Sequence, residues 1–461
     1  MDIGFRAEGL TNRIAEAASR GMAGTPGPHV RHAVSRAFTD TVAVMLAGRS
    51  TDAVRAVRRH YLASTSGPSE ASVLLGPEKT ASRIAALINA TAAHVLDFDD
   101  VALQSHPSAV LVPALLAEGE RLHVRGTELV NAYVVGYGVW AELISRDADP
   151  HHMSGWHPTS VFGSVASAAA VCALRRASAV ETRHALGIAA SLSGGVMANF
   201  GSMTKPLHAG LAAAHGIEAS ELAACGLTSA EDALEHRSGL LAVVSPRGKV
   251  DLSAGELRRL HGATEAIELS VKQYPVCNAV HRVLDAALAL IAAHDIAPGD
   301  VEVMRVTVST VQRGLLRYDR PQNALEAKFS LPFALACVLH RRRLGLAELC
   351  DEFVRSADIH ALIPRIQIEG SDARSPTHAG LPLNELELVL KDGRAFADRD
   401  IGPARGSPTR PLGIDELRSK FDDCLSTVER PARDLIWTTL MDLDAVADVS
   451  TMMPTLSEPI R

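Results

Sequence analysis

The spacing of apolar residues divides the chain into a long helical part and a shorter part with strands. From residue 8 to about 262, apolar positions recur at helical spacing, and Gly48 is a plausible end of one helix. Residues 161–174 form an apolar stretch whose small residues would let a neighbouring helix approach closely. These small residues are Gly163, Ser167 and Ala170. The pattern predicts closely packed helices over the first half of the chain.

The pattern changes near residue 265, where short segments alternate between apolar and polar residues. Such alternation is typical of strands with one buried face. The predicted strands are residues 267–271, 301–308, 366–368, 386–390 and 394–396, and Asp392-Gly393 supplies a tight turn before the last of them. Helical spacing returns between the strands, at residues 280–292 and 330–340.

The domain organisation follows from this order of helices and strands. Residues 414 to about 452 are helical again after a link rich in Pro and Gly, and we expect them to return to the first domain. The sequence therefore predicts a mainly α fold with two domains. A large all-helical domain would span residues 1–264 and be completed by residues 405–461, and a smaller α+β domain would span residues 265–404.

Composition and charge exclude several classes of protein. The 461-residue chain carries a net charge of −7 and no long basic run, so its overall field would not attract nucleic acid or an acidic membrane. The segment Met1–Gly4 does not begin a signal peptide, and no apolar run is long enough to cross a membrane. The six cysteines are scattered, which argues against a disulfide framework and a Cys-rich metal cage. We expect a protein of the reducing cytoplasm.

The acidic run Asp97-Phe98-Asp99-Asp100 is the first candidate site, and it follows His94 at the end of a helical pattern. His94, Asp97 and Asp100 are spaced to share one helix face. Three carboxylates so close together repel one another unless a cation or hydrogen bonds compensate. The run could supply a general acid or base, an acid that orients a substrate, or a Mg²⁺ site. It could equally cap neighbouring helices or pair with arginine.

Two His-Pro steps, at His106-Pro107 and His157-Pro158, each precede an alanine-rich helical pattern. Proline suits the first turn of a helix and disfavours helical geometry in the residue before it, so each histidine should lie at a helix start. The helix dipole there favours anions and a neutral imidazole, which suits proton transfer beside a bound carboxylate. A simple capping role is the alternative for each histidine.

Lys205 has apolar neighbours, unlike most surface lysines. It lies within the segment Gly201–Gly210, close to Phe200 and Met203, in a loop that Pro206 would keep extended. A charge in such surroundings is costly unless it meets an anion, so the sequence predicts an anion-binding lysine. The alternative is a lysine whose apolar stem is buried while its ammonium group reaches water.

Lys272, Cys277 and His281 follow the first predicted strand and could all reach a cleft between the two domains. The alternative for His281 is a core histidine whose hydrogen bonds are satisfied. The alternative for Cys277 is a small buried apolar residue.

Six segments, taken together and in this order, resemble the MmgE/PrpD family, which includes 2-methylcitrate dehydratase, cis-aconitate decarboxylase and iminodisuccinate epimerase. They are His94–Asp100, His106–Ser108, Gly155–Pro158, Gly201–Gly210, Lys272–His281 and Ala327–Phe333. The resemblance implies a large helical domain with a smaller α/β lid domain, and an active site between the two. It also implies a homodimer that needs no cofactor and no metal.

The resemblance assigns pocket positions residue by residue, and it also reveals departures from the family pattern. The pocket positions fall on Asp97, His106, His157, Lys205, Lys272 and Cys277. Val101 stands where the decarboxylase and dehydratase pattern has a threonine, Cys277 where it has a histidine, and Phe333 where it has a tyrosine. The sequence therefore keeps the anion-binding half of the pocket and changes its proton-handling half.

The expected chemistry begins with removal of a hydrogen next to a carboxylate. This step needs a base, together with cations that stabilise the enediolate-like intermediate. The residues expected to act are Lys205 and Lys272 as cations, His157 or the Cys277/His281 pair as base, and Asp97 or His106 as acid. The expected substrate is a small di- or tricarboxylate, and the expected enzyme is a cofactor-independent lyase, either a dehydratase or a decarboxylase.

Three other functions stay open at this point. An epimerase or isomerase of an imino- or amino-dicarboxylate such as iminodisuccinate would need two bases, and Lys272 should lower the pKa of the Cys277 thiol to supply one of them. A non-catalytic carboxylate-binding or scaffold homologue would fit the departures from the family pattern. A terpenoid cyclase would use the acidic run to protonate its substrate, but only 4% of the residues are aromatic, too few for a carbocation-stabilising cavity.

Overall fold

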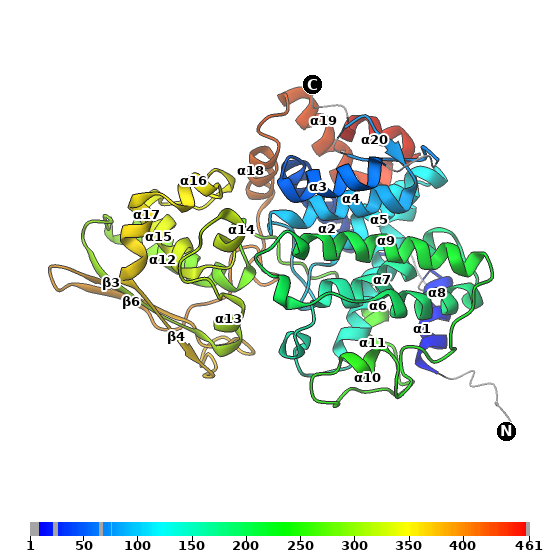
Figure 1. Ribbon diagram of the computed structural model, residues 1–461, viewed down its shortest axis with the longest axis horizontal. Coiled ribbons are helices and arrows are strands. Elements are labelled where there is room, and N and C mark those ends of the chain that lie inside the picture. The colour runs from blue at the N-terminus through cyan, green and yellow to red at the C-terminus, as the bar shows by residue number, and fades with distance from the viewer. Residues whose placement is uncertain (1–8, 22–25, 64–67, 75, 458–461) are drawn as a thin grey trace.

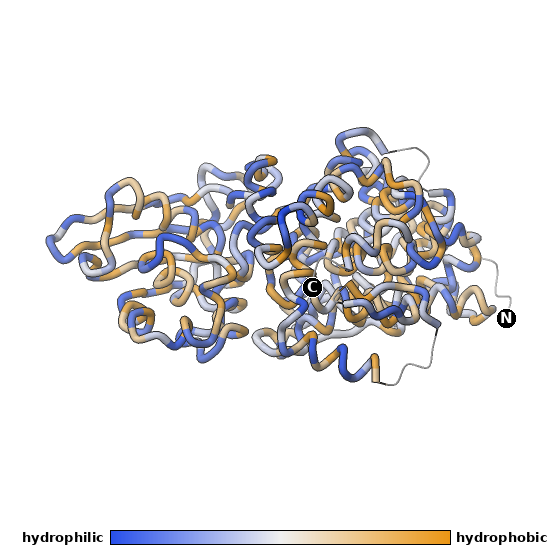
Figure 2. Tube along the Cα trace, turned by 90° about the horizontal axis from the view of Figure 1, so that it is seen from above, coloured by the Kyte–Doolittle hydropathy of each residue, from blue (hydrophilic) through white to orange (hydrophobic). Residues whose placement is uncertain are grey.

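The computed structural model describes residues 9–21, 26–63, 68–74 and 76–457, which form two lobes joined side by side (Figures 1 and 2). The prediction about a signal peptide rests on Met1–Gly4 and lies outside these residues. Within the described residues, no helix combines the length and the apolar character needed to cross a membrane. The larger lobe is helical apart from the short pair β1 (Ala71–Ser72) and β2 (Lys79–Thr80), and the smaller lobe contains a sheet.

The helical lobe combines the first half of the chain with its last helices. Its first helices are α1 (Leu10–Ser19), α2 (Pro28–Gly48), α3 (Asp52–Ala63), α4 (Ser82–Val95), α5 (Pro107–Leu122), α6 (Gly126–Ser145), α7 (Pro158–Leu174), α8 (Ala179–Leu192), α9 (Thr204–Ala224), α10 (Leu240–Val244) and α11 (Arg258–Gly262). Its last helices are α18 (Ile414–Cys424), α19 (Arg430–Met441) and α20 (Val449–Ser457). The structure places α18 and α19 against α2, and α20 against α5, so one core includes both ends of the chain.

Helix α7 lies at the centre of this lobe, in contact with α5, α6, α8 and α9. A Cβ atom at Gly163 would lie 2.9 Å from the Trp140 ring, and one at Gly216 of α9 would collide with Ser167. The predicted close approach to the small residues of α7 is therefore confirmed. Such close packing leaves little room for the helices to shift relative to one another, so the polar residues at their ends keep fixed positions.

The smaller lobe is a four-stranded sheet with helices packed on it. Its strands are β3 (Val301–Ser309), β4 (Ile366–Ser371), β5 (Glu385–Leu390) and β6 (Ala395–Asp398), in the order β4-β3-β5-β6. Strand β3 is parallel to β4 and antiparallel to β5, which is antiparallel to β6. The helices are α12 (Asn278–His294), α13 (Thr310–Leu315), α14 (Ala324–Ala327), α15 (Leu331–Arg341), α16 (Asp351–Val354) and α17 (Ala357–Leu362). We call this lobe the lid domain.

The predicted strand at residues 267–271 is wrong. Only Ser270 makes a bridge, with Val101 of the helical lobe, and the next residue, Val271, donates to the backbone oxygen of Gly406. Its alternating pattern arises because Ile267 and Leu269 pack against the core of the helical lobe while Glu268 between them is exposed, not because the segment belongs to the sheet. The segment places Lys272 beside the turn that follows α4.

Candidate active site

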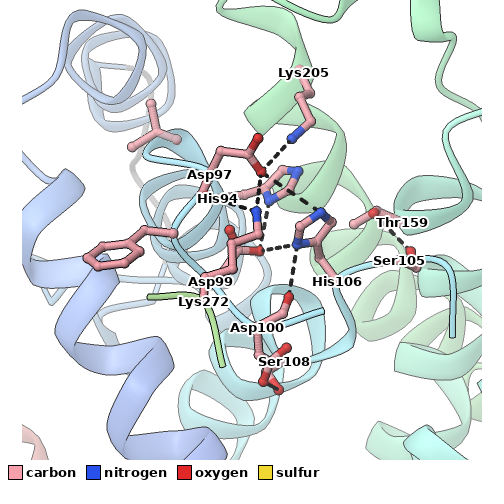
Figure 3. Close-up of polar contacts among 12 residues, drawn as sticks. His94, Asp97, Asp99, Asp100, Ser105, His106, Ser108, Thr159, Lys205 and Lys272 are labelled. Carbon is pink, nitrogen blue, oxygen red and sulfur yellow. Dashed lines mark hydrogen bonds and ion pairs between the residues drawn. The ribbon is translucent and has the colours of Figure 1, made fainter. Parts of the chain in front are cut away.

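The acidic run lies in a turn that begins where α4 ends. Helix α4 stops at Val95, and Asp97 adopts a left-handed backbone conformation with φ of 52°. The prediction that His94, Asp97 and Asp100 share one helix face is therefore wrong, because the helix ends before the run begins. Instead, the side chains of Asp97, Asp99 and Asp100 point in different directions from the turn, and each contacts different residues (Figure 3).

Asp97 is the partner of two buried lysines. Its Oδ1 atom lies 2.8 Å from Nζ of Lys272 and 3.1 Å from Nζ of Lys205, and all three side chains are nearly inaccessible to solvent (Figure 3). Burial alone would raise the pKa of Asp97, but the two ammonium groups hold it well below its usual range. This direction favours an ionised Asp97 carboxylate. The role of Asp97 as a proton-donating acid stays a prediction.

Lys205 lies in the first turn of α9, not in an extended loop as predicted. Pro206 follows it within that turn, where a missing backbone N–H costs nothing, so the proline starts the helix instead of preventing it. The Lys205 ammonium group lies 5.4 Å from the centre of the Phe200 ring and 5.1 Å from that of Phe329. A lysine between two aromatic faces and one carboxylate confirms that its surroundings are apolar and that its charge meets an anion.

His106 and His94 both contact Asp99. Nδ1 of each ring lies 2.9 Å from Oδ2 of Asp99, and Nδ1 of His106 is also 2.9 Å from the backbone oxygen of Asp100 (Figure 3). Because both neighbours of the His106 Nδ1 atom are acceptors, that nitrogen carries the proton and donates it. Its Nε2 atom faces the other carboxylate, at 3.9 Å from Oδ1 of Asp97.

Both His-Pro steps lie at helix starts, as predicted. His106 precedes α5, which begins at Pro107, and His157 precedes α7, which begins at Pro158. His157 is buried, and burial together with Lys205 holds its pKa well below the usual range, which favours the expected neutral imidazole. Its Nδ1 atom lies 3.0 Å from Nδ1 of His208, and one of the two rings donates to the other. Burial lowers the pKa of His208 to about 4.

Cys277 and His281 differ from what was predicted for them. Burial and the nearby Asp97 raise the pKa of the Cys277 thiol, and Lys272 only partly offsets this. The predicted thiolate is therefore wrong, because desolvation of the sulfur outweighs one lysine that is already paired. His281 is 1% exposed, and its Nε2 atom lies 3.2 Å from the backbone oxygen of Val276 beside the Tyr274 ring. It is the satisfied core histidine of the alternative interpretation.

A cavity of about 1260 Å³ lies between the helical lobe and the lid domain and contains most of the predicted residues. Asp97, His106, His157, Lys205 and Cys277 line it, with Phe200 and Phe329 as apolar walls. Lys272 is not part of the lining and reaches the cavity only through Asp97. Of the two other departures, Val101 lines the cavity, whereas Phe333 is buried in the lid core.

The charged side chains around this cavity favour an anionic ligand. The cations in its lining are Lys205, Arg282, Arg374 and Arg405, and the carboxylates are Asp97, Glu268 and Asp372. A carboxylate substrate would therefore be attracted locally even though the whole chain has a net charge of −7. At the inner end of the cavity, burial strengthens each of these interactions because water does not screen them.

One group of side chains in the described residues could hold a metal ion. Ligand atoms of His94, Asp97, Asp99 and His106 all lie within 4.8 Å of one another. However, the Asp97 carboxylate already receives two ammonium groups, and a divalent cation there would be repelled by both of them. The donor set therefore suits proton handling and anion binding better than it suits a cation.

Several residues of this site were not chosen from the sequence. Asp99 and His208 belong to segments with the family pattern, but only the folded chain shows that Asp99 orients His106 and that His208 faces His157. Ser105 and Thr159 also line the cavity, with their hydroxyl groups 2.9 Å apart. Thr159 and Ser105 could have been predicted from the sequence, because each lies next to one of the two His-Pro steps.

The fold and the site together define a two-domain, mainly α enzyme with a buried lysine–carboxylate centre at the junction of its domains. The chain matches the MmgE/PrpD N-terminal domain over residues 12–253 and the MmgE/PrpD C-terminal domain over residues 274–442. It therefore belongs to the MmgE/PrpD family, which confirms the resemblance found in its motifs.

The chain is also similar to curated enzymes over most of its length. It is 29% identical to the cis-aconitate decarboxylase of Mus musculus over 392 residues, which are 81% of this chain and 78% of that protein. It is 29% identical to the enzyme of that name from Homo sapiens over 347 residues, 73% of this chain and 71% of that protein. The Aspergillus terreus enzyme of that name is 22% identical over 421 residues, 84% of this chain and 82% of that protein. These similarities support an enzyme of the lyase class at the level of the family.

Proposed function

We propose that this protein is a cofactor-independent lyase of small di- or tricarboxylates, and that its leading reaction is decarboxylation of a cis-aconitate-like substrate. The observation that carries the proposal is the convergence of Lys205 and Lys272 on Asp97 at the inner end of the interdomain cavity. The similarity to three enzymes named cis-aconitate decarboxylase supports the choice among the reactions of the family.

Substrate binding would use the cations that Asp97 balances in the free protein. Lys205 lines the cavity and can turn toward a substrate carboxylate, while Lys272 keeps its contacts with Asp97. Phe200 and Phe329 exclude water on the other side of the Lys205 ammonium group. A charge-assisted hydrogen bond in such surroundings is stronger than the same contact in water.

Decarboxylation breaks the bond between carbon and the departing carboxylate, and CO₂ leaves without the bonding electron pair. That pair stays on the carbon skeleton and is delocalised onto a neighbouring carboxylate, whose added negative charge Lys205 would stabilise. A proton must then be delivered to carbon. The Cys277 thiol lines the cavity and, with its raised pKa, keeps its proton for this step. The His157–His208 pair also holds a proton between its rings.

Dehydration is the second candidate reaction, and the favourable observation is that His106 lines the cavity with its Nδ1 atom held by Asp99 and by the Asp100 backbone. The neutral form of His106 would take a proton at Nε2 from the carbon next to a carboxylate, and Lys205 would stabilise the resulting intermediate. Epimerisation would need a second base on the opposite face of the substrate. A thiol whose pKa is raised stays protonated at neutral pH and is not available to accept a proton, so the site gives epimerisation less support than the sequence did.

The test is incubation with a panel of carboxylates in D₂O, followed by ¹H and ¹³C NMR. The panel contains cis-aconitate, citrate, 2-methylcitrate and iminodisuccinate. Decarboxylation releases bicarbonate and places deuterium on one carbon of the product, dehydration creates an alkene signal, and epimerisation exchanges a C–H for C–D without loss of mass from the skeleton. We expect bicarbonate release from cis-aconitate. If no member of the panel changes, the proposed lyase function is wrong.

A further inference from the structure

Three buried lysines from three distant parts of the chain donate to the backbone of the turn that carries Asp97. We call residues Val95–Phe98 the Asp97 turn. The three contacts are Lys328 Nζ to the Val95 oxygen at 2.6 Å, Lys272 Nζ to the Asp97 oxygen at 2.7 Å, and Lys420 Nζ to the Phe98 oxygen at 2.8 Å. None of these lysines is more than 5% exposed. Three successive anchoring contacts on four residues indicate a backbone that must be held in place.

The Asp97 turn needs such anchors for two physical reasons. The last carbonyl groups of a helix lack partners within the helix, and α4 ends at Val95 in a place that water does not reach. In addition, Asp97 has a left-handed backbone, which costs a non-glycine residue on the order of 1 kcal/mol. Ammonium groups are favourable at the C-terminal, negative end of a helix dipole. Here they donate to the carbonyl oxygens that lack partners within the helix, and they fix the backbone of Asp97 in its left-handed conformation.

None of the three anchoring lysines lines the cavity, and two of them belong to parts of the chain far from α4 in sequence. Lys328 follows α14 in the lid domain, and Lys420 belongs to α18 near the C-terminus. Lys420 also forms an ion pair with Asp40 at 2.6 Å and lies 4.1 Å from the centre of the Phe98 ring. Neither Lys328 nor Lys420 lines the cavity, so neither can touch a substrate there.

We propose that Lys328 and Lys420 are positioning residues, which fix the Asp97 turn so that the Asp97 carboxylate meets Lys205 and Lys272 at the inner end of the cavity. The catalytic consequence rests on the proposed lyase function. Because Lys328 belongs to the lid domain, this placement of Asp97 is complete only when the lid is seated on the helical lobe. The turn therefore links lid seating to the geometry of the catalytic lysines.

The experiment compares Lys328→Met and the double variant Asp40→Asn/Lys420→Met with the wild type. The double variant removes both members of the ion pair, so no buried carboxylate is left without its cation. A matched control is Arg365→Met, since Arg365 also donates to two backbone oxygens, those of Pro298 and Val301, but in the lid domain away from the cavity. Two measurements are made on each protein, hydrogen exchange of the amides of residues 96–100 and steady-state kinetics with the substrate found in the NMR panel.

We expect exchange at residues 96–100 to become at least about tenfold faster in both test variants, while exchange in α7 is unchanged. The kcat should fall about 10- to 100-fold with KM within about threefold, because Lys205 still binds substrate but the Asp97 geometry is lost. Arg365→Met should change neither quantity. Unchanged exchange at residues 96–100 in both folded variants would overturn the positioning role. Lack of turnover by the wild type would overturn the lyase function instead, so the two failures are read from separate measurements.

Discussion

Replacement of Lys205 by methionine removes one positive charge from the inner end of the cavity with little change in side-chain volume. The Lys205 ammonium group is 3.1 Å from Asp97 and 6% exposed, so a substrate carboxylate that replaced this contact would lie within about 4 Å of it. At an effective dielectric constant of about 20, a unit charge at that distance contributes about 4 kcal/mol. Removing one preorganised donor from a developing anion costs about 3 to 4 kcal/mol in other enzymes. Both figures predict a 10²- to 10³-fold loss of kcat/KM.

The fold should survive this change, because Asp97 keeps Lys272 at 2.8 Å and its charge stays paired. The assay follows loss of cis-aconitate by NMR for the wild type, Lys205→Met and the control Lys249→Met, whose side chain is exposed and does not line the cavity. Circular dichroism and the thermal midpoint check that all three are folded. A folded Lys205→Met enzyme with turnover close to that of the wild type would refute the role given to Lys205.

Four further predictions concern metal, assembly, the thiol and pH. Dialysis against EDTA should leave turnover unchanged, whereas loss on chelation that Mg²⁺ restores would mean that the acidic run binds a cation. Light scattering at micromolar concentration should give a homodimer, as the alanine-rich helices of residues 120–225 suggest, and a monomer would contradict this. Iodoacetamide should alkylate Cys277 more slowly at neutral pH than the exposed Cys225, because the Cys277 pKa is raised, and equal rates would contradict that assignment. Burial raises the pKa of Asp100 to about 8, so the stability that its protonated form contributes is complete below pH 4 and is lost as pH rises toward 8. In urea unfolding, the stability advantage of the wild type over Asp100→Asn should therefore fall between pH 5 and 8, by up to about 1.4 kcal/mol per pH unit, and a constant difference would contradict it.

The fold was largely predictable because its signals are local. Helical spacing and the small residues of α7 predicted the packed helices, and proline after His106 and His157 predicted two helix starts. The strands of the lid were predicted from alternation and from the Asp392-Gly393 turn. Residues 267–271 were predicted as a strand for the same reason, but alternation indicates only which side chains are buried. It does not indicate whether a neighbouring strand pairs with the segment, and this segment forms only one isolated bridge.

The sequence predicted most of the residues that line the cavity, but not the electrostatics of the site. Motifs placed Asp97, Lys205 and Lys272 in one pocket, yet the protonation of Asp97 and Cys277 depends on burial and on distances that the sequence does not contain. The same limit applies to Lys328 and Lys420, which reach the Asp97 turn from positions more than 200 residues away along the chain. Long-range contacts of this kind have no local pattern, so only the folded structure could reveal them.

We propose that the lysine–carboxylate centre of the interdomain cavity performs lyase chemistry on a small carboxylate without a cofactor. The most direct test is ¹³C NMR of EDTA-dialysed protein with uniformly ¹³C-labelled cis-aconitate in D₂O, beside Lys205→Met under the same conditions. We expect labelled bicarbonate and a product with one deuterium from the wild type, at a rate about 10²- to 10³-fold above that of the variant. An unchanged cis-aconitate spectrum with wild-type protein, or equal rates from both proteins, would contradict it.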